Sequence, residues 1–461
     1  MLADSDTRWK WGALTARRLA PDARIDGLLL RGRATPTPRQ LAEVGVEVDT
    51  LREVTSAEFV HAAARRDAYD MVVLSCVGGA VQAMLHGLAR ALAPDGDAGA
   101  GEDTEVRRPV LVTGYVGIVY EKLSDGLLLR HGADVVLANS RHDAKRFREV
   151  YEGVGADAGS VVECALPFLD GATPEAVRAA VPGRAGAGHP GDPAAAGVGA
   201  QERPFTVTFA VQPSVPAGRA DRAYLLRRAT EHARIHPRRE VLIKLRSKPG
   251  EHTTHIEEQP YQRLAAKLPG GLPPNCRLVY GHMGEVLDRT DLLVTVSSTA
   301  ALESLHRSVP TAVLTDLGVR EALGNHHFLG SGCFASWDEL DSGHLPKADP
   351  EWTARQGVHP HGGYAAAFDA ARARVAELAA RDTLPRPAPY YTPATAPGYL
   401  PGILARYGLR PDGSPRPGAA DAADDSGVRR AVRNAVREAA RGAYRHGVQR
   451  VAPVIRRMGD L

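Results

Sequence analysis

Short apolar runs alternate with amphipathic segments along the first 150 residues. Branched apolar residues concentrate in the runs 24–31, 69–75, 108–113 and 135–138, which favours buried strands. Between them, apolar residues recur at helical spacing over 8–19, 56–66, 78–92 and 143–151. Weaker strands are expected at 1–3 and 46–51. Strands and helices that alternate in this way predict a parallel, doubly wound sheet.

The same alternation resumes in a second part of the chain. Strands are expected at 205–211, 240–245, 277–280, 292–296 and 311–314, and helices at 221–236 and 261–268. Two such regions predict an α/β fold of two Rossmann-like domains. In folds of this kind ligands bind at the carboxyl ends of the strands. We therefore expect both parallel sheets to face a central cleft that holds the ligand.

Changes in composition suggest the domain boundaries. Residues 171–203 are rich in Ala, Gly and Pro and are expected to link an N-terminal domain, 1–170, to a second domain, 204–350. A helix within 351–384 is expected to pack back on the domains. Residues 385–426 are first Pro-rich and then acidic, as in a linker, and the Arg-rich residues 427–461 predict a basic amphipathic helical tail.

Bulk composition narrows the class of protein. With 44% hydrophobic and 24% charged residues, the 461-residue chain is typical of soluble globular proteins. A net charge of +3 and an aromatic content of 5% do not favour nucleic-acid binding. The four cysteines are widely spaced, which argues against disulfides and metal clusters. We expect a cytoplasmic protein, without a signal peptide, whose basic tail either adsorbs to anionic lipid at the inner face of the membrane or is a solvated helix.

The stretch DLLVTVSSTAALESLHRSVP (291–310) carries the clearest candidate chemistry. A predicted strand ends in Ser297, Ser298 and Thr299, and a helix bearing Glu303 follows at once. The first N–H groups of a helix that starts at the carboxyl edge of a sheet bind anions, phosphate above all. The alternative is a simple helix cap.

Other polar groups also follow predicted strands. Asp4 and Asp6 are candidates for a general base, although acidic residues at a helix start explain them equally well. Lys244 and Arg246 suit a phosphate or a sugar carboxylate, and His282 is placed to touch a nucleotide. Loop residues expected to line the cleft are Glu251, His255, Glu257, Asn325 and His326.

These residues carry a resemblance to a known family. The run DLLVTVSSTAALESLHRSVPTAVL resembles the second-domain signature of GT-B glycosyltransferases. The chain from ADSDTRWKWG through LIKLRSKPGEHTTHIEEQPY to GNHHFLGSG is similar to a family of proposed glycosyltransferases. More distantly, Ser297 and Ser298 resemble the paired serines with which bacterial polysialyltransferases and 3-deoxy-octulosonate transferases hold the phosphate of a CMP-sugar.

The resemblance implies a role for each residue. Ser297, Ser298 and Thr299 would hold the nucleotide phosphate, and Glu303 would reach the ribose. Lys244, Arg246 and His282 would neutralise the leaving phosphate or the donor sugar, and Asp4 or Asp6 would deprotonate the acceptor.

The expected reaction follows from these roles. It is metal-independent transfer, without a cofactor, from a nucleotide sugar, such as a CMP- or UDP-sugar, to a cell-envelope or capsule-type glycan or a lipid-linked acceptor. The alternatives are an enzyme like the UDP-sugar 2-epimerases and a non-catalytic, GT-B-like nucleotide-binding or assembly protein.

Overall fold

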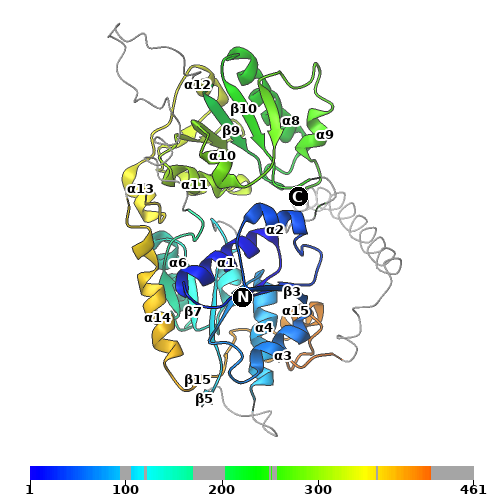
Figure 1. Ribbon diagram of the computed structural model, residues 1–461, viewed down its shortest axis with the longest axis vertical. Helices are drawn as coiled ribbons and strands as arrows, with labels where there is room; N and C mark the ends of the chain where they lie inside the picture. Colours follow the sequence, from blue (N-terminus) through cyan, green and yellow to red (C-terminus); the bar gives the residue numbers. More distant parts are fainter. Residues whose placement is uncertain are drawn as a thin grey trace, which may run out of the picture. The chain divides into compact units, whose positions relative to one another are not determined.

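The computed structural model describes residues 1–93, 105–118, 122–169, 203–248, 251, 257–359 and 362–416. The predicted linker at 171–203 therefore lies almost wholly outside the described residues, and so does the tail at 427–461. In what is described, two sheets of parallel strands with helices around them form the two halves of the chain (Figure 1).

The first sheet has seven strands in the order β3-β2-β1-β4-β6-β7-β8. Its strands are β1 (Leu2–Ala3), β2 (Asp26–Leu30), β3 (Thr50–Val54), β4 (Met71–Ser75), β6 (Val110–Gly114), β7 (Val135–Ala138) and β8 (Val161–Glu163). Its helices are α1 (Asp6–Leu19), α2 (Pro38–Val44), α3 (Ser56–Ala64), α4 (Gly78–Ala91), α5 (Leu123–Leu128) and α6 (Arg141–Gly153). All its strand pairs are parallel.

The second sheet has six strands in the order β11-β10-β9-β12-β13-β14. They are β9 (Thr206–Ala210), β10 (Glu240–Lys244), β11 (Cys276–Val279), β12 (Leu292–Thr295), β13 (Thr311–Leu314) and β14 (Phe334–Ala335). The helices around them are α8 (Arg219–Ile235), α9 (Tyr261–Ala265), α10 (Met283–Leu287), α11 (Ala300–His306), η1 (Glu321–Leu323), η2 (Asn325–Phe328) and α12 (Trp337–Asp341). The predicted α/β fold with two Rossmann-like sheets is confirmed.

The chain then returns to the first sheet. The elements after the second sheet are α13 (Pro350–Arg355), η3 (Ala365–Phe368), α14 (Asp369–Ala379), β15 (Leu384–Pro385) and α15 (Leu400–Arg406). Helix α14 contacts α1 and strands β6, β7 and β8, and α15 packs on α4 (Figure 1). Strand β15 pairs antiparallel with β5 (Glu105–Val106). Residues 365–406 thus complete the hydrophobic core of the first half.

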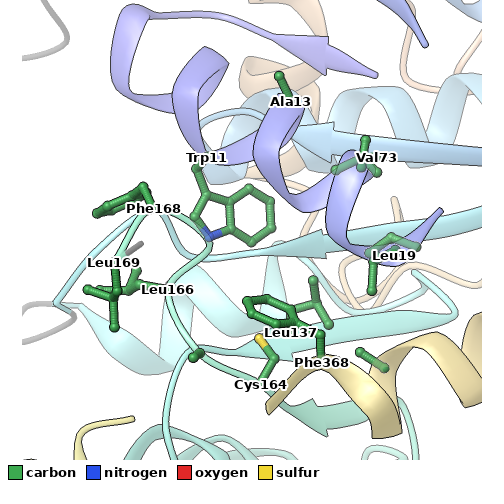
Figure 2. Packing of buried hydrophobic residues seen from close by; sticks show 14 of the residues in the cluster. Trp11, Ala13, Leu19, Val73, Leu137, Cys164, Leu166, Phe168, Leu169 and Phe368 are labelled. Atoms are coloured by element: carbon green, nitrogen blue, oxygen red, sulfur yellow. The ribbon is translucent and has the colours of Figure 1, made fainter. Parts of the chain in front are cut away.

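Helix α1 joins the first sheet to this returning segment. Trp11 is fully buried and lies in one cluster with Val73 of β4, Leu137 of β7 and Phe368 of η3 (Figure 2). The indole Nε1 of Trp11 donates to Asn139 Oδ1 at 3.2 Å, so the buried polar atom is satisfied. This packing fixes the start of α1, where the chain leaves β1 at the carboxyl edge of the sheet.

Two expected elements differ in the structure. Residues 46–51 were expected to form the third strand, but β3 begins at Thr50, and Val46 and Val48 pack against the core as part of a loop. The expected helix after Pro350 is divided into α13, η3 and α14, because Gly357, Gly362 and Gly363, all at positive φ, interrupt it. Within the part of the chain that the structure describes, no helix is both long and apolar enough to cross a bilayer.

Candidate active site

A cavity of about 340 Å³ lies where the carboxyl ends of strands from the two sheets meet. Its lining from the first half is Asp6, Thr7, Lys10, Gln40, Glu43, Val44, Val116, Ile118 and Phe168. Its lining from the second half is 210–215, 244–246, 281–283, 297–300 and Glu303. A cavity of this size at this edge is the usual ligand site of such folds. The predicted GT-B-like arrangement, with both sheets facing a central cleft, is confirmed.

Asp6 and Arg246 meet across the cavity. Arg246 donates from Nη2 to Asp6 Oδ1 at 2.6 Å and from Nε to Asp6 Oδ2 at 3.2 Å, and it also donates to the Thr7 hydroxyl. Burial acts to raise the pKa of Asp6, but the charge and hydrogen bonds of Arg246 outweigh it and hold this pKa below its usual value. Asp6 is therefore ionised at neutral pH.

Asp4 points elsewhere, although it lies only two residues before Asp6. Its Oδ2 accepts the backbone N–H of Val77 at 2.9 Å, and its Oδ1 lies 3.2 Å from Arg8 Nη1. Asp4 is not among the residues that line the cavity. Of the two candidate bases, Asp6 is thus the one that the fold brings to the cavity.

Lys244 ends strand β10, lines the cavity and is 8% exposed. Its Nζ donates to the carbonyl of Leu245 at 2.7 Å and lies 3.8 Å from Glu43 Oε1. Burial lowers the pKa of Lys244 to about 8, and the nearby charges of Glu43 and Glu303 only partly oppose it. Lys244 therefore carries a charge that a bound anion would stabilise.

Glu303 and His282 lie on the same wall. Glu303 is 5% exposed, and its Oε2 lies 3.2 Å from Lys10 Nζ of helix α1. His282 precedes helix α10, and burial, together with the charge of Lys10, lowers the pKa of its imidazole. The imidazole is therefore neutral near pH 7 and is available as either a donor or an acceptor of a hydrogen bond.

The serine turn lines the cavity, but several of its polar groups already have partners. The Ser297 N–H donates to Gln212 Oε1 at 3.0 Å and its hydroxyl donates to the Leu323 carbonyl at 2.6 Å. Ser298 Oγ accepts the Ala300 N–H at 3.2 Å, and Thr299 Oγ1 accepts the Ile118 N–H at 3.4 Å. Ser297 thus fixes the turn, and Ser298 and Thr299 line the cavity beside it.

The loop residues predicted to line the cleft are placed outside the cavity lining. Glu251 pairs with Arg39 of α2, and Glu257 pairs with Arg222 of α8. Asn325 is fully buried, where its amide donates to the carbonyls of Leu314 and Gly318 and orders the loop after β13. His326 follows it in η2 and does not line the cavity. His255 lies outside the described residues.

Sequence reasoning missed several residues of the cavity, among them Lys10, Glu43 and Gln212. Lys10 and Glu43 lie on helices α1 and α2, where a charged residue is ordinarily solvated, so nothing in their local sequence marks them. Gln212 follows the central strand β9 and donates from Nε2 to Ser297 Oγ at 3.2 Å. Its place directly after a predicted strand is a signal that could have found it.

A group with metal-ligand spacing lies outside the cavity. Among the described residues, ligand atoms of His232, His236 and Asp341 lie within 4.8 Å of one another. Both sides of this group are occupied by guanidinium groups: Arg239 Nη1 lies 3.2 Å from His232 Nε2, and Arg228 Nη2 lies 2.8 Å from Asp341 Oδ2. These cations oppose a metal ion, and the cluster ties α8 to α12.

The lining gives the cavity cations and carboxylates in equal number. The cations are Lys10, Lys244 and Arg246, and the carboxylates are Asp6, Glu43 and Glu303. Cations in a partly enclosed site stabilise a phosphate and the charge that develops on it as a leaving group. A carboxylate on the opposite wall can accept a proton from a hydroxyl group.

Several solved structures are similar to this chain. The S. aureus protein MnaA, in a co-structure with UDP, aligns with a TM-score of 0.45 and 12% identity over 79% of this chain and 92% of that chain. UDP-GlcNAc 2-epimerase from Neisseria meningitidis, bound to UDP-GlcNAc, aligns with a TM-score of 0.45 and 10% identity over 81% of this chain and 98% of that chain. The glycotransferase of kitacinnamycin aligns with a TM-score of 0.37 and 14% identity over 92% of this chain and 96% of that chain.

Comparison at the level of sequence families is decisive. No curated protein matches the chain. One family does match, over residues 1–378, and its description is "Putative glycosyltransferase (DUF6716)". The match includes both sheets and every residue that lines the cavity. The chain therefore belongs to this family of glycosyltransferases.

Proposed function

We propose that the cavity binds a nucleotide sugar and that the enzyme transfers its sugar to a glycan or lipid-linked acceptor of the cell-envelope or capsule type. The observation that carries the proposal is the cavity itself. In it Lys244 ends one strand of the second sheet and Arg246 follows two residues later, opposite Asp6 of the first half. This places groups that attract a phosphate across from a group that can take a proton.

The donor is held mainly by the second half of the chain. Lys244 and Arg246 contact its phosphate, the hydroxyls of Ser298 and Thr299 line the same wall, and Ser297 holds the turn. Glu303 reaches the ribose hydroxyls, and His282 lies beside the leaving group. The nucleobase of the donor is cytosine, as in the CMP-sugars of the polysialyltransferase resemblance, or uracil. Direct binding measurements decide between the two.

Asp6 is the proposed catalytic base. Its carboxylate accepts the proton of the acceptor hydroxyl while the sugar–phosphate bond breaks. Most of the rate enhancement comes from orienting two substrates and stabilising the departing phosphate. Because Lys244 and Arg246 supply the positive charge, the reaction needs no metal ion, and we expect EDTA to leave the rate unchanged.

A panel of nucleotides tests the donor site. We expect CMP, CDP, UMP, UDP, GDP or TDP to raise the melting temperature selectively, because a ligand that binds only the native state stabilises it. The Lys244→Ala and Ser298→Ala variants should lose the shift. No shift with any nucleotide at millimolar concentration would contradict the proposal and favour a non-catalytic assembly protein.

A sugar-nucleotide 2-epimerase is the second candidate. Such an enzyme needs acid–base carboxylates on both sides of the sugar, and the cavity has Asp6 and Glu43 on one side and Glu303 on the other. Incubation of the enzyme with UDP-GlcNAc, without an acceptor, separates the two reactions. Formation of the 2-epimer would support the second candidate, and an unchanged sugar would support the transferase.

A further inference from the structure

Lys244, which ends β10, and Arg246, two residues further on, are each held by a carboxylate from the first half of the chain. Asp6 receives two hydrogen bonds from Arg246, at 2.6 and 3.2 Å. In this bidentate geometry a guanidinium group binds a carboxylate or a phosphate. Because both side chains line the cavity, Asp6 occupies the place where Arg246 would receive an anion from solution.

Glu43 occupies a second position at which the protein could bind an anion from solution. Its Oε1 accepts the backbone N–H of Gly281 at 2.6 Å and lies 3.8 Å from Lys244 Nζ. Gly281 has a φ of 103°, a conformation that residues with a side chain rarely adopt. A backbone N–H and a buried ammonium group therefore converge on one carboxylate oxygen, as they would on a phosphate oxygen.

The positions occupied by the Asp6 and Glu43 carboxylates lie next to each other. Lys244 is the last residue of β10, Arg246 lies two residues beyond it, and both side chains line the cavity. Two residues of chain place their Cα atoms at most about 7 Å apart. Long side chains at that spacing can reach two phosphate groups that share a bridging oxygen.

We propose that Asp6 and Glu43 hold the places of two linked phosphates, and that a nucleoside diphosphate sugar displaces both carboxylates when it binds. This inference rests on the proposed function and narrows its donor to the diphosphate class. It also assigns Glu43 a role as a built-in competitor of the donor. Donor binding then frees Asp6 from Arg246.

The freed Asp6 carboxylate takes part in the transfer step. The acceptor oxygen forms a bond to the anomeric carbon of the sugar, and its proton passes to Asp6. The bond from that carbon to the diphosphate breaks, and its electron pair leaves with the nucleoside diphosphate, which Lys244 and Arg246 stabilise. Since Asp6 is paired until the donor arrives, an acceptor that binds alone is not deprotonated.

Glu43→Gln is the variant that tests this competition. It keeps the shape of the side chain and removes the charge that competes for Lys244 and the Gly281 N–H. Calorimetric titration with UDP, GDP and CDP should show affinity about tenfold higher than for the wild type, the equivalent of one hydrogen bond to a charged group. The matching monophosphates should bind more weakly than the diphosphates to the wild type.

Glu53→Gln is the matched control. Its carboxylate also lies 3.8 Å from a cation, Arg31, and it belongs to strand β3, outside the cavity. The same change in net charge should leave the affinity within about twofold of the wild type. If Glu43→Gln folds poorly, Asp6→Asn tests the same competition at Arg246, with higher affinity for the diphosphate again expected.

The outcomes separate this inference from the function on which it rests. Higher diphosphate affinity in Glu43→Gln alone supports the competition. Unchanged or weaker affinity in that variant, an equal gain in Glu53→Gln, or tighter binding of monophosphates would overturn the inference while leaving a nucleotide-binding enzyme. Failure of every nucleotide to bind the wild type would overturn both.

Discussion

Lys244 combines burial with an anion-binding role, and this combination makes ligand binding depend on pH. Burial lowers its pKa to about 8. The charged groups that act on it are Glu43 of α2 and Glu303 of α11, which oppose the shift, and Lys10 of α1 and the neighbouring Arg246, which add to it. Only the protonated ammonium group attracts a phosphate strongly.

The affinity for the nucleotide should therefore fall as the pH rises. Above pH 8, where Lys244 loses its proton in the free protein, binding has to restore that proton. The dissociation constant should then increase by up to about tenfold per pH unit toward pH 10. Lys244→Arg, whose guanidinium stays charged, should show a nearly flat profile over the same range. Parallel profiles in calorimetric titrations of the two proteins would contradict this role.

The lowered pKa of Lys244 affects the stability of the fold in the opposite direction to nucleotide affinity: stability rises with pH. Because the pKa of Lys244 is lower in the fold than the value of 10.5 in an unfolded chain, the unfolded chain binds the proton more tightly between pH 8 and 10.5. This residue's contribution to the free energy of unfolding should accordingly increase with pH across that window. The loss of nucleotide affinity therefore does not reflect unfolding at this group.

Asp6 and Asp4 can be told apart by substitution. Asp6→Asn should lower kcat by roughly 10²- to 10⁴-fold, the usual contribution of a general base. Asp4→Asn should cost far less, because Asp4 bonds to the Val77 N–H and pairs with Arg8 outside the cavity. Initial-rate assays with the donor identified by binding measure both. A larger loss in Asp4→Asn would assign the base to the other carboxylate.

Residues at strand ends could be predicted from sequence, and residues on helices could not. Lys244, Arg246, His282 and the serine turn directly follow or end predicted strands, and parallel strands bring such positions to one edge. Lys10 and Glu43 reach the cavity only because helices α1 and α2 of the first half lie against the second half. No local pattern encodes that contact.

At the scale of elements, close packing between α1 and the first sheet requires a glycine. A Cβ at Gly114 of β6 would lie 2.8 Å from the Trp11 ring and 2.9 Å from the Leu137 carbonyl oxygen. Because the oxygen belongs to the backbone of a neighbouring strand, it cannot move aside cheaply. The close approach of these elements therefore depends on the missing side chain.

Gly114→Ala should destabilise the protein. We expect a loss of about 1–3 kcal/mol from overpacking, seen as a lower melting temperature. Gly402→Ala is the control, since Gly402 lies within α15 and a Cβ added there would meet no atom within 4 Å. That substitution should stabilise by up to about 1 kcal/mol through helix propensity. Equal melting temperatures for the two variants would refute the packing argument.

Most elements were predictable because their signals are local. Helices α2 and α3 begin with capping boxes, Thr37 with Gln40 and Thr55 with Glu58, and α2 ends at Gly45 in the left-handed conformation. Strand β3 was misplaced because it is an exposed edge strand, with only Val54 buried, while the apolar residues just before it pack as a loop. Hydrophobic pattern alone cannot separate these two cases.

At the scale of the whole molecule, ion pairs join the two halves around the cavity. Asp6–Arg246, Lys10–Glu303 and Glu43–Lys244 line it, and Arg39–Glu251 lies outside its lining. A ligand that takes over the cations must break some of these contacts. We therefore expect donor binding to change how the two halves engage.

The expectation that the protein adsorbs to anionic lipid concerns residues 427–461, whose sequence is Arg-rich. If this segment adsorbs to anionic lipid, the full chain should float with vesicles that contain phosphatidylserine, and more weakly at high salt. A chain ending at residue 426 should stay in solution. Equal flotation of the two proteins would exclude the segment as the membrane-binding element.

The most direct test of the account is a crystal structure with the nucleoside diphosphate that gives the largest rise in melting temperature. We predict that its phosphates contact Lys244, Arg246 and the Gly281 N–H, and that Asp6 no longer pairs with Arg246. A nucleotide bound outside the cavity, or bound inside it with the Asp6–Arg246 and Glu43–Gly281 contacts intact, would contradict the account.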